Sequence, residues 1–278
     1  MNDTFNAKRF GFVFRKDMLE NGKQYTRLFL TMLGVMTILF LWQSFDYYPS
    51  RSHYRDFNVD LLTSASILFA ILGILFVSTF MSPMSDKTKR IAYLTCPASH
   101  FEKALSRWLI VTAGYIVAFF VALWIADALR VGICATRYPD IDVKFLDLGK
   151  LFHPGDGFAK GYLFDNASVF ICVLSAYLLI QSLFILGATF FEKAAFVKTF
   201  IAVSVIVLAF IFICRWTILL SYGDFYGFEQ VLDSFIDGNE ITPKQAAVAA
   251  TSVMSVFTLT NWTLAFCKLR ESEITQRL

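Results

Sequence analysis

Few residues in this chain have the type and spacing that catalysis or metal binding requires. The histidines, His53, His100 and His153, all fall in expected loops, and the five cysteines, at positions 96, 134, 172, 214 and 267, form no C-x-x-C pair. No phosphate-binding G-x-x-x-x-G-K-S/T loop, H-E-x-x-H or G-x-S-x-G motif is present. We therefore expect no catalytic, cofactor-binding or metal site in this chain, and we interpret the cysteines as small packing residues.

Composition places these residues on membrane-spanning helices. Of the 278 residues, 56% are hydrophobic and 17% are charged, whereas a soluble domain carries about 25% charged residues. The mean hydropathy is +0.57. These values predict an all-α integral membrane protein with a single transmembrane domain over residues 1–278.

Six apolar segments are long enough to cross a bilayer as helices. The expected spans are residues 28–45, 61–82, 104–129, 166–191, 199–221 and 244–267. Asp60 is placed to cap the second span. Arg107 and Asp127 lie near the two ends of the third span, where we expect both to reach the membrane surfaces. The polar residues 130–165 form an outer loop without a clear secondary-structure pattern.

Helix-start signals and amphipathic patterns mark three further places. Thr242 and Gln245 form a T-x-x-Q cap with Pro243 at the first helical position, which predicts the start of the sixth span. Residues 228–236 have the spacing of a short amphipathic helix at the outer surface. Residues 7–25 have an amphipathic pattern that is typical of a surface helix, interrupted by Phe12 and Leu19. Its apolar members are Phe10, Val13, Phe14 and Met18.

Residues 85–107 form a long polar segment between two apolar segments. This segment contains its own helix-stop and helix-start signals. Its apolar residues 91–94 are too few to cross a bilayer, and Pro97 stops a continuous helix. Ser99 and Glu102 then form an S-x-x-E capping box, which predicts a new helix from about His100. A short surface helix followed by a break and a fresh span suits a contact point for a soluble partner.

The distribution of basic residues indicates the topology. With six spans both termini lie on one side, and 16 of the 25 Lys and Arg residues lie on that side, together with the 85–107 segment. The positive-inside rule therefore predicts that the termini and this segment are cytoplasmic, in a multi-pass protein of the cell (inner) membrane.

This layout resembles the permease subunit of an ABC-2 type transporter. The local likeness lies in a charged run at 86–90, an apolar segment at 91–94, then Thr95 with Pro97, Ser99, and Lys103 with Arg107. The sequence YLTCPASHFEKALSR is also similar to sequences in a Bacteroides-like branch of such permeases. The chain departs from the family in its longer 130–165 loop. It also begins the polar segment with DKTKR at residues 86–90, where family members commonly have an acidic residue followed by Gly-Thr.

The resemblance implies a fold and a set of partners. The 7–25 segment would be an elbow helix and the 85–103 loop a coupling helix that docks on a separate ABC ATP-binding subunit, which carries the ATP and Mg. A second permease copy or a paralogue would complete the pathway of an exporter, with no nucleic-acid partner. The residues implied in coupling are Lys87, Lys89, Arg90, Tyr93, Leu94, Ser99 and Glu102.

Other functions stay open. A non-transport membrane sensor or accessory protein could bind a ligand through the 130–165 loop. A secondary transporter is disfavoured by the absence of mid-span charges and of an obvious inverted repeat, and a membrane enzyme by the absence of catalytic motifs. Arg215, near the outer end of the fifth span, either reaches the outer surface or acts at an outer gate.

Overall fold

The computed structural model describes the chain outside a few segments. It covers residues 5–50, 56–80, 91, 96–151, 161–164, 166–191, 194–222 and 242–275. The expected outer helix at 228–236 lies outside these residues. The chain divides into two compact units, residues 1–167 with 266–278, and residues 168–265.

Five of the described helical segments are long and apolar enough to cross a membrane. They are α1 (Ala7–Ser50), α2 (Phe57–Val77), the continuous helical segment His100–Arg137, α6 (Ala167–Phe190) and α7 (Ala195–Tyr222). Length and composition identify a multi-pass membrane protein, as the sequence predicts.

The sixth expected span forms a helix, α9 (Pro243–Thr275), that is not among those five. Its start is as predicted, because the Thr242 N–H donates to Gln245 Oε1 at 2.9 Å and the Gln245 N–H donates to Thr242 Oγ1 at 3.3 Å. Hydroxyl residues lower its hydropathy. Several of these hydroxyls, such as those of Thr251 and Thr258, donate to the carbonyl four residues earlier, which satisfies them within the helix. That α9 spans the membrane stays a prediction.

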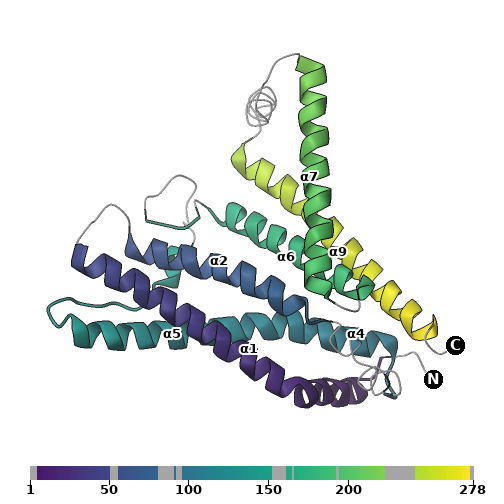
Figure 1. Ribbon diagram of the computed structural model, residues 1–278, viewed down its shortest axis with the longest axis horizontal. Helices are drawn as coiled ribbons and strands as arrows, with labels where there is room; N and C mark the ends of the chain where they lie inside the picture. The colour runs from purple at the N-terminus through teal and green to yellow at the C-terminus, as the bar shows by residue number, and fades with distance from the viewer. Residues whose placement is uncertain are drawn as a thin grey trace. The chain divides into compact units, whose positions relative to one another are not determined.

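The first unit is built around α1, α2 and α5 (Tyr115–Arg137), which lie side by side in Figure 1. Apolar side chains of the three helices form one core. The Tyr115 hydroxyl donates to the Phe69 carbonyl at 2.7 Å, which ties α5 to α2. The core residues are Met32, Met36, Phe40, Leu61, Ala65, Leu68, Tyr115, Phe119, Ala122, Leu123 and Ala126.

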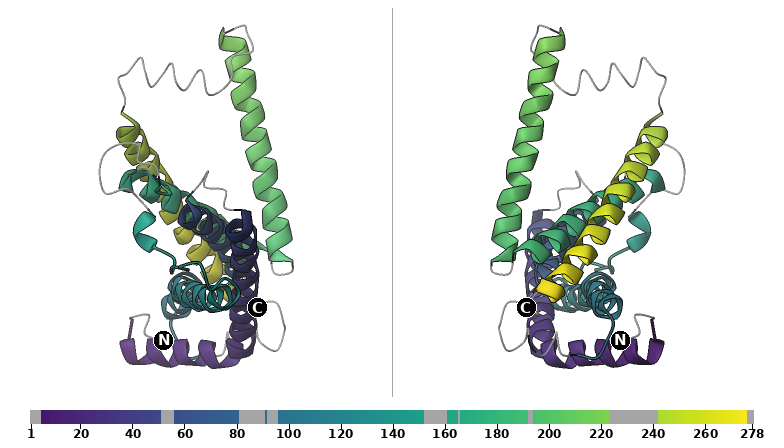
Figure 2. Two further views of the ribbon diagram at one scale, coloured as in Figure 1. Left: turned by 90° about the vertical axis from the view of Figure 1, so that its left-hand side faces the viewer. Right: turned by 90° about the vertical axis from the view of Figure 1, so that its right-hand side faces the viewer.

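Helix α1 joins the expected surface helix and the first span in one continuous run of 44 residues. Figure 2 shows its purple N-terminal part lying crosswise to the rest of the helix. In this part, Val13, Asp17 and Asn21 are buried. Phe12 and Leu19, the residues that interrupt the expected apolar stripe, are 72% and 73% exposed. The N-terminal part of α1 therefore packs against the protein through a mixed apolar and polar face.

Two details at the N-terminal end of α2 and the C-terminal end of α5 differ from expectation. The cap of α2 is Asp56, whose carboxylate accepts from the Asn58 N–H at 3.1 Å, so Asp60 lies within the first turn. The helix begins earlier than predicted because Asp56, too, is a favourable cap. The third expected span also continues to Arg137, which shortens the outer loop.

Asp127 was predicted to extend to the membrane surface, but it is buried within the protein. Its carboxylate is buried and accepts from Arg130 Nε at 2.7 Å and from the Leu146 N–H at 2.8 Å. Arg130 also donates to the Lys144 carbonyl at 2.7 Å. The physical reason is that the outer loop folds back over this end of α5 and supplies partners that the sequence pattern does not show. Lys150 forms a further ion pair with Asp56.

The second unit contains most of α6 and α9 together with α7. The Asn261 amide donates to Ser182 Oγ at 2.9 Å, which joins α9 to α6. Phe184 and Phe196 stack with ring centroids 5.7 Å apart, which joins α6 to α7. The fourth and fifth spans thus form close to their predicted limits, although α7 begins at Ala195 rather than at Thr199.

Gly187 of α6 permits the close approach of α7. The side chain of Thr199, which is buried, occupies the space that a Cβ at position 187 would need. Gly187→Ala is therefore expected to lower the free energy of unfolding by about 1–3 kcal/mol through overpacking, measured as thermal unfolding in detergent. Adding Thr199→Ala should recover part of this loss. Gly34→Ala is the matched control, since a Cβ at position 34 meets nothing within 4 Å. An equal loss in both single variants would contradict this packing.

Candidate functional site

Five of the seven residues implied in coupling, Lys87, Lys89, Arg90, Tyr93 and Leu94, lie outside the described residues. The structure describes the other two at the point where the polar loop becomes a helix. Helix α4 (His100–Leu109) begins as predicted, directly after Ser99.

The predicted capping box is present at the start of α4. Ser99 Oγ accepts from the Glu102 N–H at 3.2 Å, and Glu102 Oε2 accepts from the Ser99 N–H at 3.0 Å. These reciprocal bonds satisfy two helix-end donors and fix where the loop stops.

Glu102 also binds the start of α1, which the sequence does not reveal. Arg9 donates from Nε to Glu102 Oε2 at 2.7 Å and from Nη2 to Oε1 at 2.8 Å, and the Asn6 N–H donates to Oε1 at 2.8 Å. The Glu102 side chain is 0% exposed. One buried carboxylate therefore holds the cap of α4 and the first turn of α1 together through a two-point arginine contact.

A second ion pair, buried on both sides, joins the same two helices. Asp17 Oδ1 accepts from Arg107 Nη2 at 3.1 Å, and Asp17 Oδ2 accepts from Ser106 Oγ at 3.0 Å. The Arg107 and Asp17 side chains are 4% and 5% exposed. Arg107 was expected to extend alone to the membrane surface; it is instead buried and paired with Asp17, which the bend of α1 brings to it.

We call these contacts, made by Asn6, Arg9, Asp17, Ser99, Glu102, Ser106 and Arg107, the α1–α4 junction. The polar side of α4 faces inward here: Glu102, Lys103, Ser106 and Arg107 are all buried. Their spacing of three and four residues places them on one helix face, a pattern that could have indicated that α4 packs through a polar face, although not against which helix. Phe101 also contacts Phe5 and Phe266, with ring centroids 6.2 Å away in each case.

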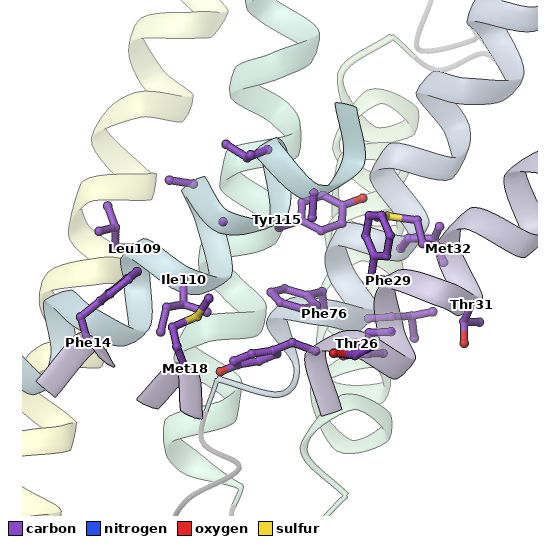
Figure 3. Close-up of a pocket in the computed structure, with 18 residues that line it drawn as sticks. Phe14, Met18, Thr26, Phe29, Thr31, Met32, Phe76, Leu109, Ile110 and Tyr115 are labelled. Carbon is purple, nitrogen blue, oxygen red and sulfur yellow. The ribbon is translucent and has the colours of Figure 1, made fainter. Parts of the chain in front are cut away.

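Directly after α4 the helix widens into a π-helical turn, η2 (Ile110–Gly114), before α5. Such turns interrupt the regular ladder and often occur at functional sites. A groove of about 720 Å³ lies beside it. Its lining is almost entirely apolar and comes from α1, α2 and the α4–α5 segment, with Phe29, Phe76 and Tyr115 turned toward it in Figure 3.

The remaining expectations concern Arg215, metal binding and the cysteines. Arg215 is exposed on α7, and its role at an outer gate stays a prediction. Among the described residues no group of three or more His, Cys, Asp or Glu side chains could hold a metal ion. Cys96, Cys134, Cys172 and Cys267 are free.

Comparisons with known proteins assign the chain to no family. No protein-family model matches it, and neither a curated protein nor a solved structure matches it significantly.

Proposed function

We propose that this chain is the transmembrane subunit of an ATP-driven ABC-2 type exporter. It would form half of a dimeric pathway in the cell membrane and bind a separate ATP-binding subunit through the 85–103 loop. The observation that carries this proposal is the α1–α4 junction. A polar loop that ends in a helix tied to a second membrane helix by two ion pairs, one buried and one partly buried, is suited to pass a movement from the loop into the membrane.

The junction gives the proposal a mechanical basis. In the proposed mechanism, closure of the ATP-binding subunits displaces the 85–103 loop on the cytoplasmic side. Ser99 and Glu102 fix the end of the loop to α4, and Arg9 and Asp17 fix α4 to α1. Helices linked in this way shift as rigid bodies rather than deforming, so a displacement of the loop would tilt both spans. The N-terminal part of α1 would take the place of the elbow helix.

A specific observation favours the alternative of a membrane sensor. Part of the outer loop is held in place by Asp127, Arg130 and Lys150. An ordered outer loop could present a ligand-binding surface. This function would not require an ATP-binding partner, which separates the two proposals experimentally.

The test is co-purification of the tagged full chain from its native membranes. We expect an ABC ATP-binding subunit to be recovered with the parent protein and to be lost from the triple variant Arg90→Glu, Tyr93→Ala, Leu94→Asp. Recovery should also fall for Arg90→Glu alone but not for Arg270→Glu. The latter is the matched control, since Arg270 is exposed and is also expected on the cytoplasmic side.

All variants should unfold at the temperature of the parent in detergent, which separates loss of docking from loss of folding. Recovery of the ATP-binding subunit with the triple variant would contradict docking through this loop. Its absence from the parent preparation would favour the sensor.

A further inference from the structure

The N-terminal part of α1 presents an outward face that the α1–α4 junction does not use. Phe12 and Leu19 lie seven residues apart, two helical turns, and therefore on the same side of the helix. This side is opposite the junction, because Val13 and Asp17 are buried. Two large apolar side chains that are more than 70% exposed thus form one outward stripe.

Three exposed cations flank this stripe. Lys8 precedes Phe12 by four residues, Arg15 precedes Leu19 by four, and Lys23 follows Leu19 by four. At this spacing each cation is a surface neighbour of a stripe residue. Lys8, Arg15 and Lys23 make no ion pair within the part of the chain that the structure describes. The face therefore combines apolar side chains with positive charge that is not neutralised.

The position of this face relative to the bilayer follows from the continuity of α1. The same helix runs without interruption into an apolar membrane-spanning segment. Because the N-terminal part lies crosswise to that segment (Figure 2), it runs along the membrane surface rather than away from it. Phe and Leu insert at the boundary between headgroups and acyl chains, and nearby Lys and Arg attract anionic lipids.

We propose that this face, formed by Lys8, Phe12, Arg15, Leu19 and Lys23, binds the headgroups of anionic phospholipids. The cations contact the lipid phosphates, and Phe12 and Leu19 enter the boundary of the acyl chains. This binding holds the N-terminal part of α1 at the surface while its opposite face carries the junction. It requires no ATP-binding subunit, so it stands or falls independently of the proposed transport function.

The first test measures lipid selectivity of the full chain. Native mass spectrometry in neutral detergent compares bound phosphatidylglycerol with phosphatidylcholine. We expect the parent to prefer phosphatidylglycerol, and the triple variant Lys8→Gln, Arg15→Gln, Lys23→Gln to lose this preference by roughly tenfold or more, since it removes three cations that attract anionic headgroups. The matched control is the triple variant Lys144→Gln, Lys198→Gln, Arg270→Gln, which should retain the preference. Equal preference in the two triple variants would overturn the proposal.

The second test identifies what touches the face. The photoreactive analogue p-benzoylphenylalanine replaces Phe12 in the full chain, in nanodiscs that contain phosphatidylglycerol. We expect a cross-linked product heavier by one phospholipid. The same analogue at Phe145, which is 63% exposed in the outer loop, should give far less of it. A product with a protein at position 12, or no lipid product above the Phe145 control, would overturn the proposal.

Discussion

Glu102→Ala is expected to lower the free energy of unfolding by about 2–4 kcal/mol, because it removes a buried carboxylate that accepts from Arg9 and from two backbone N–H groups. Thermal unfolding of the full chain in non-ionic detergent should show a fall in Tm on the order of 10 °C. Glu102→Gln should lose less, since its amide oxygen can still accept one of these bonds.

Glu20→Ala is the control for this prediction. Glu20 is half exposed and pairs with Lys16 at 3.7 Å one turn away, and such surface pairs contribute about 0–1 kcal/mol. If Glu102→Ala and Glu20→Ala unfold at the same temperature, Glu102 does not hold the two helices together.

The second large effect is expected at the other ion pair of the junction. Asp17→Ala leaves the buried Arg107 guanidinium without its carboxylate, which should cost about 3–5 kcal/mol of unfolding free energy. The double variant Asp17→Leu, Arg107→Met removes both charges and should unfold at a higher temperature than Asp17→Ala, because no unpaired charge remains buried. The measurement is again thermal unfolding in detergent. A double variant less stable than Asp17→Ala would show that the pair does not act as described.

The features that the sequence predicts well depend on neighbouring residues. The capping boxes at Ser99 and Thr242 join atoms three residues apart, so the pattern alone specifies both helix starts. The fourth and fifth spans follow from uninterrupted apolar runs, which have few alternatives to a membrane helix. The prediction that Asp60 caps α2 was wrong, because Asp56, four residues earlier, takes this position.

The features that the sequence does not predict join residues far apart in the chain. Arg9 and Glu102 are 93 residues apart, and Asp17 and Arg107 are 90 apart. No local sequence pattern in α1 or α4 identifies the residue of the other helix with which each charged side chain pairs. Arg107 was therefore expected to reach the membrane surface by itself.

The stripe of residues 7–25 illustrates the same limit. Periodicity shows that a helix has two faces, but not which face meets the protein. The structure buries Val13 of the expected stripe together with Asp17 but exposes Met18, so this end of α1 packs through a face that is partly apolar and partly charged.

The proposed docking of the 85–103 loop on an ATP-binding subunit is tested most directly by site-specific cross-linking. The analogue p-benzoylphenylalanine is placed at Tyr93 in one variant and, as a control, at Trp124 in another, since Trp124 is 69% exposed on a membrane-spanning helix. Illumination of native membranes should then join position 93, but not position 124, to an ABC ATP-binding subunit that mass spectrometry identifies. No such product from position 93, or equal products from both positions, would contradict the account.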